Sequence, residues 1–450
     1  MRRTAPPVIE TGRVEALNHN AQGVVRGGKT AFVSGALPDE TVRFIRRRHH
    51  RQHDEAELVA VLEPAPQRVA PRCAHFGVCG GCSLQHLDSD AQLHIKEQQL
   101  RDSLVRLGRV TPRRWLAPLR GPQWQYRRRA RLGARFVASR GRSLVGFRER
   151  YSTHVAELRR CEVLAAPVDA LIEPLSALLT ELSIRERVPQ VEVAVAEGVA
   201  VLVIRTLDPP TADDEQLLLA FERAHGVRIF LQPGGLATVK PLREPAPPLE
   251  YTLPEQGVRI RFEPSDFVQV NAELNRLLVS RVIELLELDE GSQVLDLFCG
   301  LGNFTLPMAR RAAGVVGVEG EAALVRRARD NAVLNGIDNA EFYSADLAGA
   351  ACASAPWAQR RYSHVLLDPP RVGAREVLPL LPQLGARRVL YVSCHPASLA
   401  RDLEILVHGM GYELLAAGVA DMFPQTTHLE SLALLAPPDP PTDNRAEGTP

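Results

Sequence analysis

Short apolar stretches broken by turn residues open the chain, from Gly12 to Glu63. In the segments GRVEAL, TVRFIRRR and EAELVAVLE, apolar positions recur between polar ones, which is typical of strands with one buried face. The regular spacing of these segments predicts a small antiparallel β-barrel of the OB-like kind over residues 1–65.

The pattern is mixed between residues 66 and 263, which we predict to form a central domain. A Pro-rich hinge from Pro64 to Pro71 leads into it. Residues 90–107 carry apolar side chains at helical spacing, and residues 124–160 predict an Arg-rich strand meander. The segment VEVAVAEGVAVLVIRTL then predicts two further strands.

From residue 264 onward, helical patterns alternate with short, wholly apolar strands. The strand segments are VLDLFCG, GVVGVEG, AEFYSAD, HVLLDPP and RVLYVSC. This alternation predicts a doubly wound, mostly parallel, Rossmann-like α/β domain over residues 264–436. The last segment, 437–450 (PPDPPTDNRAEGTP), has the composition of a disordered tail.

Composition excludes several classes of protein. The chain is 45% hydrophobic and 24% charged, and no apolar run approaches the roughly 18 residues that span a bilayer. The start, MRRTAPPVIE, lacks the apolar core of a secretory signal, so we expect none. Seven cysteines are too few for a disulfide framework, and their clustering indicates metal binding or catalysis in the reducing cytoplasm.

The net charge of +1 hides an asymmetry along the chain. Residues 1–160 contain 30 Lys and Arg against 14 Asp and Glu, and the remainder contains 24 against 39. A basic front half on an acidic enzyme body predicts binding of a polyanion, with Arg43, Arg46, Arg47, Arg48 and Arg51 as candidate phosphate contacts. The alternative is that these charges are only solvated faces.

A glycine-rich turn follows the strand VLDLFCG. Gly300 and Gly302 let the backbone turn sharply and let a ligand approach it. Glu319, at the end of the next strand, could bind ribose hydroxyls, and Asp346 could bind an adenine edge. A nicotinamide dinucleotide is the competing ligand, but Thr305 stands where its third glycine is needed. The pattern looks like an S-adenosylmethionine site.

Two more motifs end predicted strands. In Asp368-Pro369-Pro370-Arg371, Arg371 occupies the position that is typically aromatic in methyltransferases acting on exocyclic amines. Cys394, in the motif SCHP, leaves its strand just before a predicted helix, whose dipole would favour the thiolate. A cysteine on a buried strand is more often an inert packing residue.

A thiolate at this position suggests one reaction in particular. Carbon 5 of uracil becomes nucleophilic only after a thiolate has added to carbon 6. A base must later remove the proton from carbon 5, and both His428 and Glu430 lie on a loop that enters the last predicted strand.

The motifs DLFCGLGNF, DPPR, SCHP and DMFP…HLES, in this order, resemble the RNA uracil-C5 methyltransferase family. The resemblance implies that Cys394 is the nucleophile, that Glu430 rather than His428 is the base, and that Phe267 stacks on the flipped uracil. It places S-adenosylmethionine at Gln269, Phe298, Asn303, Glu319, Asp346 and Asp368. One departure is His395, where the family usually has Asn.

Four cysteines, Cys73, Cys79, Cys82 and Cys161, supply a possible metal-binding set. Zinc would accept four sulfurs. The spacing resembles the [4Fe–4S] ligands of the ribosomal branch of this family, where the cluster would be structural or would orient RNA. Cys299 and Cys352 are interpreted as incidental buried thiols.

The segment from Gly23 to Glu40 resembles the TRAM domain, an RNA-binding barrel. With the cysteine set, it implies that the substrate is 23S ribosomal RNA rather than tRNA, and we expect a monomer with no obligate protein partner. A methyltransferase for another base and a non-catalytic RNA-binding assembly factor are the alternatives.

Overall fold

The computed structural model describes residues 8–438, which divide into two compact units. Unit 1 contains residues 8–95, 122–247 and 423–427, and unit 2 contains residues 96–121, 248–422 and 428–438. The chain therefore passes several times between the units. Within residues 8–438, no helix combines the length and the apolar character needed to cross a membrane.

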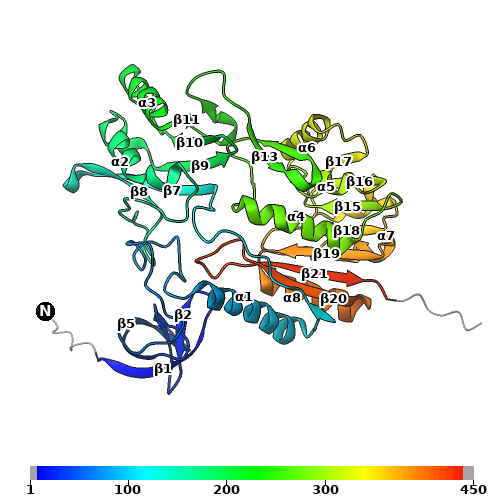
Figure 1. The fold of residues 1–450 in the computed structure, drawn as a ribbon, viewed down its shortest axis with the longest axis horizontal. Helices are drawn as coiled ribbons and strands as arrows, with labels where there is room; N and C mark the ends of the chain where they lie inside the picture. Colours follow the sequence, from blue (N-terminus) through cyan, green and yellow to red (C-terminus); the bar gives the residue numbers. More distant parts are fainter. Residues whose placement is uncertain (1–7, 439–450) are drawn as a thin grey trace, which may run out of the picture. The chain divides into compact units, whose positions relative to one another are not determined.

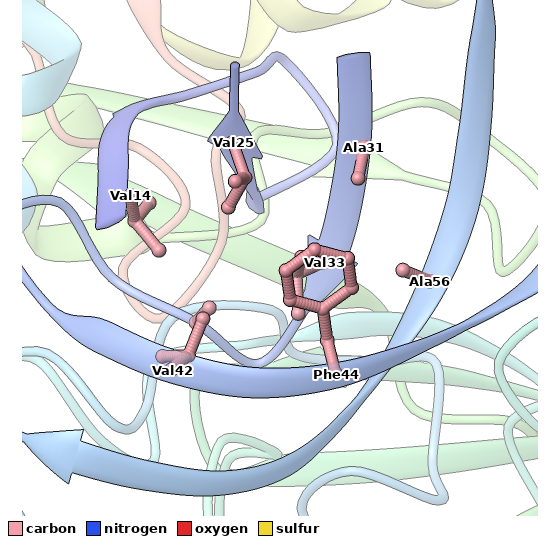
Figure 2. Packing of buried hydrophobic residues seen from close by; sticks show 8 residues of the cluster. Val14, Val25, Ala31, Val33, Val42, Phe44 and Ala56 are labelled. Carbon is pink, nitrogen blue, oxygen red and sulfur yellow. The ribbon is translucent and has the colours of Figure 1, made fainter. Parts of the chain in front are cut away.

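The N-terminal strands of unit 1 form the predicted barrel. They are β1 (Glu10–Leu17), β2 (Gln22–Val25), β3 (Thr30–Ser34), β4 (Thr41–His49) and β5 (His53–Glu63), closed in the order β1-β2-β3-β5-β4. The pairing differs from the prediction in one place, because β3 and β5 are parallel. Figure 2 shows the alternate positions that point inward and fill the barrel, namely Val14, Val25, Ala31, Val33, Val42, Phe44 and Ala56.

The second part of unit 1 is a six-stranded sheet in the order β12-β11-β10-β9-β7-β8. Its strands are β7 (Arg129–Val137), β8 (Arg142–Gly146), β9 (Gln190–Ala196), β10 (Val199–Arg205), β11 (Val227–Gln232) and β12 (Lys240–Pro241). Helix α2 (Ile172–Glu181) contacts β8, and α3 (Ala212–His225) contacts β11. The predicted meander and hairpin are β7–β8 and β9–β10, respectively.

Unit 2 is built on an eight-stranded sheet in the order β17-β16-β15-β18-β19-β21-β20-β6 (Figure 1). The strands are β6 (Arg114–Trp115), β15 (Gln293–Leu297), β16 (Gly314–Glu319), β17 (Ala340–Ser344), β18 (His364–Leu367), β19 (Arg388–Ser393), β20 (Glu413–Ala420) and β21 (Glu430–Ala436). The helices are α4 (Ala272–Leu286), α5 (Thr305–Ala309), α6 (Ala322–Leu334), α7 (Leu381–Leu384) and α8 (Pro396–Glu404). The five strands from β15 to β19 are parallel and β21 is antiparallel to β19, so the predicted Rossmann-like domain is confirmed.

Unit 2 extends beyond the range predicted for the methyltransferase domain. The hairpin of β13 (Leu249–Leu253) and β14 (Val258–Phe262) belongs to it, because the Asn331 side chain accepts from the Arg261 amide (2.8 Å) and donates to the Arg261 carbonyl (3.0 Å). Strand β6 belongs to it because it pairs with β20. The alternation of apolar and polar residues cannot predict hydrogen bonds between a side chain and the backbone, or the pairing of a short edge strand. This part of unit 2 was therefore not predicted from the sequence.

The predicted helix near residues 90–107 is α1 (Ser89–Ser103), which continues into a π-helical turn over Leu104–Gly108. Residues of α1 up to Ile95 belong to unit 1, and those from Lys96 onward belong to unit 2. All but the first two residues of the predicted disordered tail, 437–450, lie outside the described residues.

Candidate active site

The carboxyl ends of the parallel strands of unit 2 bring four of the predicted site residues together. Phe298 follows β15, Glu319 ends β16, Asp368 follows β18 and Cys394 follows β19. Because parallel strands end at one edge of a sheet, these residues share that edge, where ligands bind in such folds.

The antiparallel strand β21 brings Glu430 to the same edge. Ser393, the last residue of β19, pairs with Ser431. Cys394 and Glu430 are the next residues outward on the two strands, so they face each other across the ladder. Glu430 is 4% exposed. The register of one strand pair therefore places a thiol beside a buried carboxyl group.

The carboxyl groups of this edge are unusually basic. Burial raises the pKa of both Asp368 and Glu430, and the neighbouring Asp368 raises that of Glu430 further. Burial also raises the pKa of Asp296 to about 8, although its Oδ2 accepts a hydrogen bond of 2.5 Å from the Thr305 hydroxyl. Buried acids that raise one another's pKa values are typical of functional sites.

The Cys394 thiol is protonated in this environment. Burial and the Glu430 carboxylate raise its pKa to about 11, and Arg371 acts in the opposite direction. Burial and the neighbouring acid thus act against the thiolate that the start of α8 was expected to favour. The sequence showed only that Arg371 stands where other methyltransferases have an aromatic residue. In the structure its positive charge lowers the pKa of Cys394.

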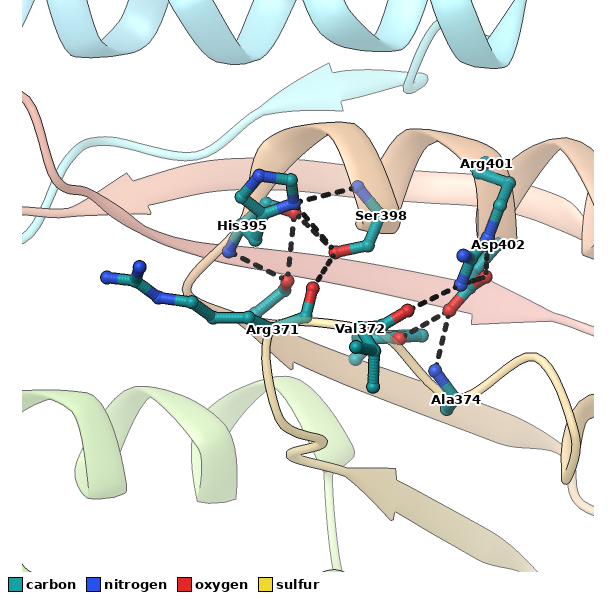
Figure 3. Close-up of polar contacts among 9 residues, drawn as sticks. Arg371, Val372, Ala374, His395, Ser398, Arg401 and Asp402 are labelled. Carbon is teal, nitrogen blue, oxygen red and sulfur yellow. Dashed lines mark hydrogen bonds and ion pairs between the residues drawn. The ribbon is translucent and has the colours of Figure 1, made fainter. Parts of the chain in front are cut away.

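The backbone of the DPPR loop is fixed to α8, as Figure 3 shows. The Ser398 hydroxyl donates to the Arg371 carbonyl (2.8 Å), and the Arg401 guanidinium donates to the Val372 carbonyl (2.8 Å). The Ala374 amide donates to Asp402 Oδ2 (2.8 Å). The Arg371 side chain itself is exposed.

The departure at His395 has a structural explanation. His395 is the N-cap of α8, and its Nδ1 accepts from the Ser398 amide at 3.3 Å. Asn is among the preferred N-cap residues because its side-chain oxygen accepts the same hydrogen bond. His395 therefore retains the cap that the family's Asn provides.

The glycine-rich turn adopts the conformation that its sequence predicts. Gly300 and Gly302 have φ of +55° and +89°, and Phe298 has φ of +67°. The Gly300 amide donates to Glu319 Oε2 at 3.1 Å, so Glu319 also holds the turn. Thr305 begins the short helix α5 and binds Asp296. Thr305, which stands where a dinucleotide site needs its third glycine, thus serves to bind the buried Asp296.

Asn303 is held by two residues that the sequence analysis missed. Its amide exchanges two hydrogen bonds with the Asn275 amide, of 2.8 and 3.0 Å, and its Oδ1 accepts from the Tyr251 hydroxyl at 2.9 Å. Asn275 is 3% exposed on an otherwise apolar face of α4. A single polar residue on the apolar face of a predicted helix was the sequence signal that could have identified Asn275 as a supporting residue.

Three further predicted residues lie in loops of unit 2. Phe267 is 73% exposed between β14 and α4, an unusual position for a large apolar side chain. Beside it, Asp266 accepts from Arg327 (2.5 Å) and from the Glu263 amide (2.7 Å), which fixes the backbone there. Gln269 is half-buried, and the exposed Asp346 accepts from the Ala348 amide.

The four predicted metal ligands of unit 1, Cys73, Cys79, Cys82 and Cys161, line one cavity of about 340 Å³, including the space open to solvent. Burial raises the pKa of Cys79 to about 11 and that of Cys82 to about 12, and neighbouring thiols of the set raise both further. Within residues 8–438, no three His, Cys, Asp or Glu side chains form a group that could hold a metal ion. The set has the four thiols that a [4Fe–4S] cluster takes as ligands, although these side chains, as described, are not arranged as a metal-binding group.

The basic segment of the barrel is partly engaged in ion pairs. Arg46 binds Glu10 (2.8 Å) and Asp54 (2.9 Å) and is 18% exposed, so it serves the barrel itself. Arg47 pairs with Glu57 at 2.7 Å. Arg43 and Arg51 are exposed at positions where a phosphate could bind.

Known proteins resemble this chain over nearly its whole length. The sequence profile described as tRNA (Uracil-5-)-methyltransferase matches residues 249–437. The "23S rRNA (uracil(1939)-C(5))-methyltransferase RlmD" of Alkalilimnicola ehrlichii is 51% identical over 94% of this chain and 95% of its own. The protein of the same name from Methylococcus capsulatus is 47% identical, over 96% and 98%.

A solved structure shares the fold. The Pyrococcus abyssi tRNA (uracil-54, C5)-methyltransferase, in complex with S-adenosyl-L-homocysteine, matches with a TM-score of 0.72 and 23% identity. The match covers 95% of this chain and all of the other. At this identity it establishes the architecture of the chain.

Proposed function

Since the chain belongs to the family of 23S rRNA (uracil(1939)-C(5))-methyltransferases, we propose that it methylates carbon 5 of the corresponding uridine in its own 23S ribosomal RNA. Its methyl donor is S-adenosylmethionine. Identity near 50% over almost the full length of the relatives supports this substrate more strongly than the profile named for tRNA, which matches only residues 249–437.

The observation that carries the mechanism is the register between β19 and β21, which sets Cys394 beside Glu430. In the proposed cycle, the Cys394 sulfur adds to carbon 6 of the uracil, and carbon 5 gains the electron density that it needs to accept a methyl group. Once carbon 5 has taken the methyl group, which would leave the donor as S-adenosylhomocysteine, Glu430 removes the proton from carbon 5. The electrons of that bond restore the double bond between carbons 5 and 6, and the Cys394 sulfur leaves as a thiolate.

The environment of each residue supports its role. A carboxylate with a raised pKa is a stronger base, and burial beside Asp368 raises the pKa of Glu430. The thiol of Cys394 must lose its proton before addition, and Arg371 favours the thiolate. The exposed ring of Phe267 offers a face on which an extruded base can stack.

The methyl donor supplies an electrophilic methyl group when it is bound. Gln269, Phe298, Asn303, Glu319, Asp346 and Asp368 would hold it. The positive φ at Gly300 and Gly302 favours glycine in this turn, and a Cβ at Gly300 would project into open space. Asn275 and Tyr251 orient the Asn303 amide, and the Gly300 amide orients Glu319.

Unit 1 would supply the affinity for RNA. We infer that Cys73, Cys79, Cys82 and Cys161 hold a [4Fe–4S] cluster that stabilises their loops or orients RNA. The exposed arginines of the barrel would contact phosphates. We further propose that the enzyme works as a monomer in the cytoplasm, where its ribosomal substrate is.

The direct test is a map of 5-methyluridine in ribosomal and transfer RNA from a strain that lacks this gene. We expect one 23S position to lose its methyl group and to regain it when the wild-type gene, but not the Cys394→Ala variant, is returned. An intact 23S methyl group with a loss in tRNA would assign the enzyme to tRNA instead.

A further inference from the structure

A lysine of α1 is completely buried. Lys96 is 0% exposed, and its Nζ lies 2.5 Å from Oδ1 of Asp421, whose side chain is 1% exposed. Burial lowers the pKa of Lys96, and Asp421 opposes that shift. A buried ion pair contributes little net stability, because desolvation of two charges offsets their attraction. Its value lies in the geometry that it imposes.

Asp421 occupies a sensitive position in unit 2. It directly follows Ala420, the last residue of β20, and Ala420 pairs with Glu430, the first residue of β21. The Asp421 amide donates to the Leu119 carbonyl at 2.9 Å. The ion pair therefore fixes the chain at the residue next to the pair that contains the proposed base.

The segment that leads from Asp421 to Glu430 is held a second time. Its residues 423–427 belong to unit 1, where Gln92 and Gln425 exchange two hydrogen bonds of 3.0 Å each. The Gln425 carbonyl also accepts from the amides of Ser83 (2.9 Å) and Leu84 (3.0 Å). Gln92 is 1% exposed and Gln425 is 4% exposed, so these bonds are shielded from water.

Both anchors come from one face of one helix. Gln92 and Lys96 are four residues apart on α1, and their partners Gln425 and Asp421 are four residues apart on the segment. Long connections between strands are otherwise mobile. Because α1 binds this connection at two points, it restricts the position of Glu430 at the end of the connection.

We propose that Lys96 and Gln92 are positioning residues for Glu430, and that they act on removal of the carbon 5 proton rather than on formation of the covalent bond. The inference rests on the proposed function, in which Glu430 is the base. A base must lie within hydrogen-bond reach of its proton, and a displacement of about 1 Å can cost roughly 100-fold in rate. Cys394 directly follows β19, on a different part of the chain from this segment.

The test is the lifetime of the covalent protein–RNA adduct in the full-length enzyme, measured by quenching into denaturant at successive times. The double variant Lys96→Met with Asp421→Leu removes both charges, because removal of one alone would leave the other buried and unpaired. We expect the methylated adduct to persist about tenfold longer or more than in wild type. Adduct formation and S-adenosylmethionine affinity should be unchanged.

The single variant Gln92→Met tests the second anchor and leaves the ion pair in place, so it serves if the double variant does not fold. We expect it to lengthen the adduct lifetime by a smaller factor. A matched control is Glu222→Leu with Arg228→Met and Arg243→Met, which removes all three charges of the ion-pair cluster around the buried Glu222 of unit 1, outside the segment. The control should lower the melting temperature without changing the adduct lifetime.

Two outcomes separate this inference from the proposed function. If Glu430→Gln traps the adduct but the folded α1 variants turn over with a wild-type lifetime, Lys96 and Gln92 are structural only. If Glu430→Gln itself leaves no adduct, the assignment of the base fails first, and with it the premise of this inference.

Discussion

Buried acids have opposite environments in the barrel of unit 1 and in the site of unit 2. In the barrel, burial would raise the pKa of Glu40, but hydrogen bonds from Arg68 and from backbone amides hold it below its usual value. Lys29, followed by Arg46, lowers the pKa of Asp54 against the effect of burial. At the site, burial raises the pKa of Asp296, and the neighbouring Asp368 and Glu319 raise it further.

The difference separates residues that stabilise a fold from residues that perform chemistry. An acid paired with a cation is ionised and contributes to stability in the native state. An acid buried beside other acids costs stability, and such an arrangement persists where function requires it. Substitution of acids by amides should therefore have opposite consequences in the two units.

The largest effect is expected on turnover at the site. Glu430→Gln should lower the rate of multiple turnover by about 10²- to 10⁴-fold, the usual contribution of a positioned base, although the first methyl group is still transferred to the bound RNA. Cys394→Ala should abolish the reaction, because no other group can add to carbon 6. Neither variant should lower the melting temperature. Transfer of a labelled methyl group and thermal unfolding measure the two properties, and a variant that loses stability but keeps full activity would contradict the comparison.

In the barrel, Glu40→Gln should cost stability rather than chemistry. The substitution leaves Arg68 without its carboxylate, and we expect a loss of about 2–3 kcal/mol in the free energy of unfolding, since Arg68 is partly exposed. A lowered carboxyl pKa contributes stability that is present above the unfolded-state pKa and is lost as the pH falls. Urea unfolding should therefore separate wild type from variant at pH 7 and bring them together in acid.

Asp296→Asn should stabilise the protein, whereas Glu40→Gln should destabilise it. The folded-state pKa of Asp296, about 8, lies above its unfolded value, so the native state loses stability as the pH rises from about 4 to about 8. An asparagine does not ionise and can still accept from Thr305. We expect the variant to be more stable than wild type by on the order of 5 kcal/mol at pH 8 and nearly equal to it at pH 4. A destabilised variant at pH 8 would show that Asp296 is ionised and compensated.

The arginines of the barrel should also fall into two groups, those that bind RNA and those that stabilise the fold. Arg43→Gln and Arg51→Gln should each weaken RNA binding and reduce the slope of log affinity against log salt by about 1, as expected for a lost phosphate contact. Arg46→Gln should instead lower the melting temperature, because Arg46 is bound to Glu10 and Asp54. Unchanged salt slopes in the first two variants would place the RNA footprint elsewhere.

The smallest effect concerns Arg371. Alkylation of Cys394 in the free enzyme should be slow at pH 7 and should rise about tenfold per pH unit, because only the thiolate reacts and its pKa is about 11. Arg371→Gln should raise that pKa further and slow alkylation a few-fold at any one pH. Peptide mass spectrometry distinguishes Cys394 from the other thiols. Faster alkylation in the variant would exclude Arg371 as the stabilising cation.

The sequence predicted the barrel and the parallel sheet because both depend on local periodicity. It also predicted which residues end the strands, and strand order then places Phe298, Glu319, Asp368 and Cys394 at one edge. That β3 and β5 are parallel was not predicted, because tertiary pairing decides the relative direction of two strands.

The supporting contacts of the site could not be predicted from sequence. Asn275 and Asn303 are 28 residues apart, and Lys96 and Asp421 are 325 apart, with no local pattern to connect them. The raised pKa of Cys394 depends on burial and then on Glu430, which only the register of β21 brings near. Motifs identify reacting residues, whereas long-range pairing sets their environment.

The fate of the covalent adduct in two variants tests the central claim most directly. The full-length Glu430→Gln and Cys394→Ala enzymes would be incubated with the RNA substrate and S-adenosylmethionine, then analysed by denaturing gel and intact mass. We predict that Glu430→Gln accumulates an RNA adduct that already carries the methyl group, while Cys394→Ala forms none and His428→Ala turns over. Full turnover by Glu430→Gln, together with a trapped adduct in His428→Ala, would assign the base to His428 and contradict the account.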